Sequence, residues 1–271
     1  MLRRLDNSQA AWCRPWLRCT RRVSSTSLSD WRRSINVEFM PVLPPSRWFP
    51  PAETADEFGL VCIGGNLTPD WLLDAYRHGL FPWPLIHGVE EPQWWSPDPR
   101  AVFEFDRFHV SRRFAQTLRS HRFTLSSDRE FAGVIRACAT TGDRRGKTWL
   151  LPEMIAAYEE LHCLGHAHSV EAWCEGQLAG GVYGVAIGGF FAGESMFHLQ
   201  RDASKVALFH LVQHLRKRGY RLLDIQQLTD HTASLGAIEI PRDEYLPRLA
   251  EAVVLPVTFG TLENSGHDLD G

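Results

Sequence analysis

The sequence predicts an α+β fold in which a mixed sheet is flanked by helices and preceded by a small N-terminal α/β domain. Three observations indicate this fold. Two strand-like segments meet at Glu175-Gly176, a dipeptide typical of tight hairpins. A third strand is predicted over 190–197, and an amphipathic helix over 204–218. A further strand is predicted over 220–227.

Composition divides the chain into an extension, 1–40, a small domain, 41–100, a larger domain, 101–255, and a flexible tail, 256–271. The extension holds eight arginines against three acidic residues and has no sustained apolar period. It also lacks the apolar segment of a secretory signal. We expect it to be disordered, or to reflect a gene start placed too early, with Met40 as the true beginning.

The small domain, 41–100, is expected to begin with an extended, proline-rich segment. Residues 60–66 predict a strand followed by a glycine turn. Thr68 and Pro69 predict the cap and first turn of a helix that ends at Gly79.

The larger domain is expected to open with helices over 114–119 and 130–139, on either side of a strand around 122–125. Another helix is predicted over 152–165, and the antiparallel strands follow it. An antiparallel meander, a helix and a strand that crosses back is the order of the GNAT acyltransferase fold. The predicted larger domain is therefore GNAT-like.

Composition also excludes several classes of protein. The 271 residues are 44% hydrophobic and 23% charged, as in ordinary globular proteins. No window approaches the roughly 18 apolar residues that span a membrane. The six cysteines include no Cys-x-x-Cys pair, so we expect reduced thiols of a cytosolic protein instead of disulfides or a zinc site.

Charge is unevenly distributed along the chain. After residue 40 the chain holds 21 basic and 29 acidic residues, yet 107–147 holds ten basic residues against three acidic ones. A basic segment on an acidic protein is expected where a protein contacts phosphates. A solvated face has the same composition, so both interpretations remain open.

Polar residues at strand positions mark the candidate site. Glu194, Asp224 and Gln226 have apolar neighbours, and burying a carboxylate or amide costs about 1–3 kcal/mol or more unless it is partnered. Asp224 and Gln226 lie two apart on one strand, so we expect both on the same face. They could orient an amine nucleophile and accept its proton, or form a hydrogen-bonded pair that holds the following loop.

The other polar residues also have two interpretations each. Glu194 could bind a cationic or amine-bearing substrate, or be the buried partner of an arginine. Adjacent residues on a turn rarely face each other, so Asp230-His231 predicts a cap, by Asp230 or Thr232, more readily than a catalytic dyad. Ser195 has no base nearby in the sequence, which argues against a catalytic triad.

Aromatic residues gather in the small domain and before the helix over 152–165. Trp83, Trp94, Trp95 and Trp149 could stack on bases or line a pocket, but aromatics this dense usually form a core.

Eight motifs resemble a known family, in that family's order: GLFPWP, WWSPDPR, GKTW, LGHAHSVEAW, AGGVYGV, GESMF, ASKVAL and DHTASLGAIEIPRDEY. Over 58–249 the chain resembles bacterial leucyl/phenylalanyl-tRNA–protein transferase. The resemblance implies transfer of Leu or Phe, with Met as a third candidate, from aminoacyl-tRNA to the N-terminal Arg or Lys of an acceptor protein. The product would be degraded by the N-degron pathway. The resemblance implies a cytoplasmic monomer with no metal, cofactor or membrane association.

The same resemblance implies roles for individual residues. Asp224 and Gln226 would be catalytic, with Gln226 accepting a hydrogen bond from the attacking amine and Asp224 polarising that arrangement. The implied substrate-binding residues are Glu194 and Ser195 at the acceptor or aminoacyl end, Trp83 and Trp149 at the terminal adenosine, and Val182 and Leu211 around the Leu or Phe side chain. The implied tRNA-binding residues, through phosphates, are Arg112, Arg113, Arg144, Arg145 and Lys147.

The chain departs from the family pattern at three positions. Thr229 stands where the family often has Asn. Val182 and Leu211 stand where Phe or Met can occupy the pocket, and smaller linings could change the preference between Leu and Phe.

The alternative function is that of an acetyl-CoA-dependent N-acetyltransferase on the same fold. Such enzymes cradle pyrophosphate with a Q/R-x-x-G-x-G/A turn, whereas 200–205 contains neither glycine. An aminoacyl-tRNA-dependent peptidoglycan transferase is a third candidate. A non-enzymatic RNA-binding module would leave Glu194, Asp224 and Gln226 without a role.

Overall fold

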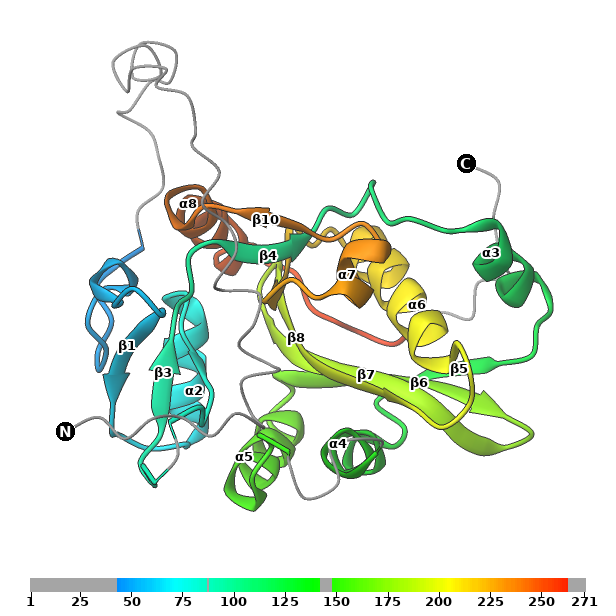
Figure 1. Ribbon diagram of the computed structural model, residues 1–271, viewed down its shortest axis with the longest axis horizontal. Coiled ribbons are helices and arrows are strands. Elements are labelled where there is room, and N and C mark those ends of the chain that lie inside the picture. Colours follow the sequence, from blue (N-terminus) through cyan, green and yellow to red (C-terminus); the bar gives the residue numbers. More distant parts are fainter. Residues whose placement is uncertain (1–42, 87, 142–147, 263–271) are drawn as a thin grey trace, which may run out of the picture. The chain divides into compact units, whose positions relative to one another are not determined.

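The computed structural model describes residues 43–86, 88–141 and 148–262, which belong to the compact unit Pro41–Gly271 (Figure 1). The expectations for 1–40, and those for Arg144, Arg145 and Lys147, lie outside the described residues.

A small antiparallel sheet follows the proline-rich entry segment and a short 3-10 helix, η3 (Ala52–Thr54). Its strands, in spatial order, are β1 (Leu60–Ile63), β3 (Gln93–Trp95) and β2 (Phe81–Pro82). The helix α2 (Pro69–Arg77) contacts this sheet through β2. The predicted strand and helix are therefore confirmed.

The predicted start of α2 is right in position but wrong in one detail. Pro69 occupies the first turn, where its missing N–H removes no helical hydrogen bond. The side chain of Thr68 precedes it without forming a capping hydrogen bond. Gly79, at φ 80°, lets the chain leave the helix toward β2.

Aromatic residues form the core of this small sheet. Trp94 is completely buried, and Trp48 stacks on Trp71 with ring centroids 5.0 Å apart. Phe49 packs edge-on against Trp94 at 4.7 Å. Trp94 therefore has the core role that dense aromatics favour.

A seven-stranded mixed sheet forms the larger part of the described structure. β8 and β9 pair in parallel, and the other neighbouring strands pair antiparallel. In spatial order the strands are β10 (Ile238–Ile240), β4 (Arg100–Phe103), β9 (Leu222–Gln226), β8 (Phe190–His198), β7 (Gln177–Ile187), β6 (Ala167–Cys174) and β5 (Thr124–Ser127).

Helices cover both faces of this sheet, as Figure 1 shows. α4 and α5 pack on one face in a core that the small sheet and α2 share, while α6 and α3 pack on the other face. The helices are α3 (Arg112–Arg119), α4 (Phe131–Thr140), α5 (Pro152–Cys163), α6 (Ala203–Arg218), α7 (Asp230–Ser234) and α8 (Arg242–Val253).

The predicted order of meander, helix and return strand is confirmed. β6 and β7 meet at Glu175 and Gly176, whose φ angles of 52° and 75° are those of a type I′ turn. α6 ends at Gly219, at φ 88°, and β9 then pairs in parallel with β8. The structure is a mixed α+β fold, as predicted.

The predicted cap near Asp230 is confirmed for Thr232, which shares it with Thr229, whereas Asp230 lies in the first turn of α7 and is not the N-cap. Thr229 is the N-cap of α7, and its side chain accepts a hydrogen bond from the backbone N–H of Thr232. The hydroxyl of Thr232 accepts in return from the backbone of Thr229. Because Asn is also a good N-cap, Thr at position 229 keeps the function that Asn could serve there.

The segment that follows α8 packs back onto the sheet. Phe259 is only 2% exposed and stacks on His168, with ring centroids 4.3 Å apart. The backbone N–H of Leu262 donates to Oγ of Ser127. The first part of 256–271, as far as Leu262, is therefore held by specific contacts.

Candidate functional site

The candidate site lies where the two parallel strands separate. β8 and β9 are paired from Phe190 to Ala192, opposite Leu222 to Asp224. β8 continues to His198 and β9 to Gln226 without further pairing between them. Beyond Ala192 and Asp224, the backbones of β8 and β9 are therefore no longer paired with each other.

Irregular pairing occurs at the same place on both strands. Gly193 and Ser195 of β8 face adjacent residues of β7, which leaves Glu194 as an extra residue. Asp224 and Gln226 of β9 likewise face adjacent residues of β4. Such bulges redirect side chains and are frequent next to active sites.

Asp224 is fully enclosed by protein. It has 0% exposure, and its Oδ1 accepts from Nε of Arg100 at 2.9 Å and from the backbone N–H of Gln226 at 2.8 Å. Its Oδ2 accepts from Nη2 of Arg100 at 2.7 Å and from the hydroxyl of Tyr245 at 3.0 Å. Four hydrogen bonds fill the acceptor capacity of a carboxylate, so Asp224 has no site left for a substrate.

Gln226 and Glu194 are brought together across the diverging strands. Nε2 of Gln226 donates to Oε1 of Glu194 at 3.1 Å, and the hydroxyl of Tyr158 donates to Oε2 of Glu194 at 2.9 Å. The hydroxyls of Tyr158 and Tyr76 lie 2.7 Å apart. The predicted alternation placed Asp224 and Gln226 on one face but did not show that Gln226 contacts Glu194.

The surroundings of Glu194 favour its protonated form. Burial raises the pKa of Glu194 to about 7, although hydrogen bonds from Tyr76 and Tyr158 act to lower it. Burial also raises the pKa of both tyrosines, so they remain neutral donors. Glu194 can consequently gain or lose a proton near neutral pH while part of the residue stays accessible to solvent.

The other predicted substrate-binding residues divide between the two faces of the sheet. Trp83 and Trp149 are partly buried against the core that contains Tyr76 and Tyr158. Val182 and Leu211, 4% and 1% exposed, belong to the core on the opposite face. Ser195 is partly buried on β8, where it lies opposite Tyr183 of β7.

The described tRNA-binding candidates are exposed. Arg112 and Arg113 occupy the first turn of α3, whose buried residues are Phe114 and Leu118. Positive charge in the first helical turn is unfavourable to the helix dipole, so helix stability does not explain these two arginines.

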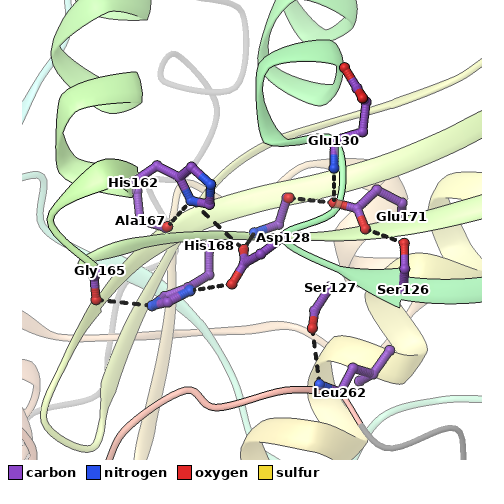
Figure 2. Close-up of polar contacts among 11 residues, drawn as sticks. Ser126, Ser127, Asp128, Glu130, His162, Gly165, Ala167, His168, Glu171 and Leu262 are labelled. Carbon is purple, nitrogen blue, oxygen red and sulfur yellow. Dashed lines mark hydrogen bonds and ion pairs between the residues drawn. The ribbon is translucent and has the colours of Figure 1, made fainter.

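A second polar cluster lies at the edge of the sheet formed by β5 and β6 (Figure 2). Asp128 accepts from Nδ1 of His168 at 2.7 Å and from the backbone N–H of Ser169 at 2.8 Å. Glu171, 0% exposed, accepts from the hydroxyls of Ser126 and Ser169. These satisfied contacts join the β5–α4 connection to β6, which is a structural role.

The described part of the chain offers neither a metal-ligand cluster nor a membrane-spanning helix. Among these residues, no group of three or more His, Cys, Asp or Glu side chains is placed to hold a metal ion. None of the described helices has the length and apolar character needed to cross a bilayer.

Sequence reasoning missed four members of the site. Arg100, Tyr245, Tyr76 and Tyr158 contact Asp224 or Glu194, directly or through another hydroxyl. Arg100 did give a signal, because it is a charged residue at the start of an apolar strand. The tyrosines lie on amphipathic helices, where their positions are typical of core residues.

Matches to two protein-family models cover every residue of the site except Arg100, which lies between the two matched ranges. Residues 102–250 match the model of the family described as leucyl/phenylalanyl-tRNA protein transferase, and 65–98 match the model of that family's N-terminal domain. A leucyl/phenylalanyl-tRNA–protein transferase of Syntrophotalea carbinolica is 50% identical over 213 residues, which are 78% of this chain and 91% of that protein. One of Thiobacillus denitrificans is 50% identical over 211 residues, 77% of this chain and 92% of that protein.

The matches and the enclosed polar site together define an aminoacyltransferase. The N-terminal family model matches the part of the chain that forms the small sheet, and the other model matches the part that forms the seven-stranded sheet. The chain belongs to the leucyl/phenylalanyl-tRNA–protein transferase family.

Proposed function

We propose that this protein transfers leucine or phenylalanine from aminoacyl-tRNA to the N-terminal Arg or Lys of acceptor proteins. The observation that carries the proposal is the contact between Gln226 and Glu194 where β8 and β9 diverge. This contact occurs in a chain half identical to proteins named for such a transfer.

The reaction exchanges an ester bond for a peptide bond. The α-amine of the acceptor attacks the ester carbonyl, loses a proton as the C–N bond forms, and displaces the 3′ oxygen of the tRNA, which takes up a proton. Because the ester is already activated, the enzyme chiefly needs to position the amine and manage its proton.

Gln226 is suited to position the attacking amine. Its Nε2 donates to Glu194, so its Oε1 is directed away from that carboxylate and can accept a hydrogen bond from the α-amine. Asp224 does not contact the substrate, because both of its carboxylate oxygens are fully occupied by hydrogen bonds. It acts on Gln226 by accepting a hydrogen bond from the Gln226 backbone N–H.

Glu194 is suited to bind the positive charge of the acceptor. A nearby guanidinium or ammonium group favours the ionised carboxylate and would lower its pKa from about 7. Acceptor binding and loss of the Glu194 proton are therefore coupled, which favours basic N-terminal residues over neutral ones.

The tRNA would contact two partly buried tryptophans and two exposed arginines. Trp83 and Trp149 pack against one core and are each only partly buried, and we propose that they hold the terminal adenosine. Arg112 and Arg113 would contact phosphates of the acceptor stem. Ser195, next to Glu194 on β8, would contact the aminoacyl group. Val182 and Leu211, which are buried in the core on the opposite face, would have to be exposed to receive its side chain as the family resemblance implies.

We further propose that 101–255 forms a GNAT-like catalytic domain and 41–100 a small N-terminal domain. The antiparallel β6–β7–β8 meander, α6 and the parallel strand β9 support the GNAT-like assignment. We also propose that the enzyme acts as a cytoplasmic monomer and that its products enter the N-degron pathway.

The acetyl-CoA alternative meets an electrostatic obstacle at α6. Asp202 precedes the first turn of this helix, in a left-handed conformation at φ 67°. Its carboxylate makes no capping hydrogen bond to the helix and lies 3.8 Å from Nε of Arg201 and 3.8 Å from Nζ of Lys205. An acidic residue at this N-cap, in a turn without the two glycines of the pyrophosphate cradle, disfavours CoA there.

A transfer assay tests the proposal. The protein is incubated with radiolabelled Leu-tRNA, Phe-tRNA or acetyl-CoA, and with a peptide that begins with Arg or a matched peptide that begins with Gly. We expect label to move from Leu-tRNA or Phe-tRNA to the Arg peptide alone. Label from acetyl-CoA only would refute the assignment.

A further inference from the structure

Arg100 has an environment that core packing alone does not explain. It is 1% exposed, and its guanidinium carbon lies 4.8 Å from the ring centroid of Phe81 and 4.7 Å from that of Tyr245. Its Nε and Nη2 both donate to Asp224, and its Nη1 donates to the carbonyl of Gly79 at 3.0 Å. The guanidinium plane is thereby fixed in position and orientation.

The stability of the fold gives little reason to keep this ion pair. Enclosing two charges carries a desolvation cost that their attraction often only balances, and apolar residues of similar volume frequently serve as well. A buried pair is better explained by what it holds in place.

Asp224 holds a strained residue of the candidate site. The backbone of Gln226 has φ 60°, a left-handed conformation that residues other than Gly, Asn and Asp rarely adopt. The backbone N–H of Gln226 donates to Oδ1 of Asp224, and the same oxygen accepts from Nε of Arg100. Any rotation of the Asp224 carboxylate would release the backbone of Gln226 from this conformation.

We infer that Arg100 is a positioning residue for the transfer reaction and acts on Gln226 through Asp224. It sets the carboxylate plane, the carboxylate holds the Gln226 backbone, and the Gln226 side chain is thereby directed to Glu194 and the attacking amine. This inference rests on the proposed function.

The third hydrogen bond of Arg100 gives this role a second consequence. Gly79 lies between α2 and β2, within the N-terminal family match at 65–98. Tyr76 of α2 contacts the hydroxyl of Tyr158, which in turn donates to Glu194. The small sheet and α2 therefore reach the site through Arg100 and through the tyrosines.

Arg100→Lys tests the inference because it keeps the positive charge and removes the planar, bidentate fork. The measurements are the single-turnover rate of Leu transfer to an Arg peptide and, separately, the Kd for Leu-tRNA. We expect the rate to fall about 100-fold, as small misplacements of a reacting group can cause, with the Kd unchanged. The control is Arg248→Lys, at a partly exposed ion pair with Glu104, which should keep the wild-type rate.

A double variant separates positioning from a general loss of packing. If Arg100 acts through Asp224, combining Arg100→Lys with Asp224→Asn should reduce the rate little beyond the larger single effect. Multiplied effects would show that the two residues act independently, and would overturn the inference. Tyr245→Phe, which removes only the hydroxyl bond to Asp224, replaces Arg100→Lys if that variant does not fold.

Hydrogen–deuterium exchange in a peptide spanning 225–229 provides a readout that needs no substrate. We expect faster exchange there in Arg100→Lys and wild-type exchange in Arg248→Lys. A wild-type enzyme that transfers no aminoacyl group would refute the proposed function, whereas this exchange measurement would still decide the positioning role. Unchanged exchange and an unchanged rate would overturn the inference.

Discussion

Replacing Glu194 with Gln is expected to stabilise the protein at pH 8 and to have a much smaller effect at pH 5. Burial raises the pKa of Glu194 from its ordinary 4.5 to about 7. The folded protein therefore binds this proton more tightly than the unfolded chain does. Gln can keep both contacts, because its oxygen accepts from Gln226 and its amide can donate to the Tyr158 hydroxyl.

The sign and size of the effect follow from these two pKa values. Below 4.5 both states carry the proton, and the wild type has no penalty from ionisation. As pH rises from 4.5 to 7 the unfolded chain loses its proton first, so the free energy of unfolding falls. The full increase in the pKa of Glu194 corresponds to a loss of at most about 3 kcal/mol in the free energy of unfolding. Because solvent reaches part of the residue, we expect a gain of about 1–2 kcal/mol for the variant at pH 8.

Urea denaturation at pH 5, 6, 7 and 8 measures this difference. The control is Glu251→Gln, at an exposed position near the end of α8. We expect the gap between Glu194→Gln and wild type to open with rising pH and to level off above 7. A gap of constant size, or one that narrows as pH rises, would refute this account of the Glu194 environment.

Three further outcomes are expected. Asp224→Ala should lower kcat strongly with little change in tRNA affinity, and loss of tRNA binding with normal single-turnover chemistry would contradict the assignment. The same variant should lose about 3–5 kcal/mol of stability in urea denaturation, because it leaves Arg100 buried without its partner. Charge reversal at Arg112 and Arg113 should weaken tRNA binding and flatten its dependence on salt, by about one unit of log–log slope for each phosphate that the protein no longer neutralises, and an unchanged slope would remove α3 from the interface. Phe259→Ala should cost about 3–5 kcal/mol, since this ring is buried against His168, and a cost near zero would show that the segment after α8 contributes little to stability.

Local sequence signals predicted much of the fold. Glu175-Gly176 predicted a hairpin because few residues tolerate two successive positive φ angles, and Gly219 predicted the end of α6 for a related reason. The energetic cost of polar residues on apolar strands also predicted a candidate site at Glu194 and Asp224, where the structure places the bulges of β8 and β9.

The partners of these residues could not be predicted in the same way. Arg100 lies 124 positions from Asp224, and nothing local to either residue specifies the other. The bulge at Glu194 and the positive φ of Gln226 depend on how neighbouring strands pair, which alternation along one strand does not describe. The same limit applies to Thr229, whose role as a cap depends on the helix that follows.

In the proposed reaction, Gln226 orients the attacking amine at the divergence of β8 and β9. The most direct test is the single-turnover rate of Leu transfer to an Arg peptide by wild type and by Gln226→Ala, with Leu-tRNA saturating. We expect rapid transfer by the wild type and a rate at least about 100-fold lower in the variant, with the Kd for Leu-tRNA unchanged. Transfer by Gln226→Ala at the wild-type rate would contradict this role of Gln226.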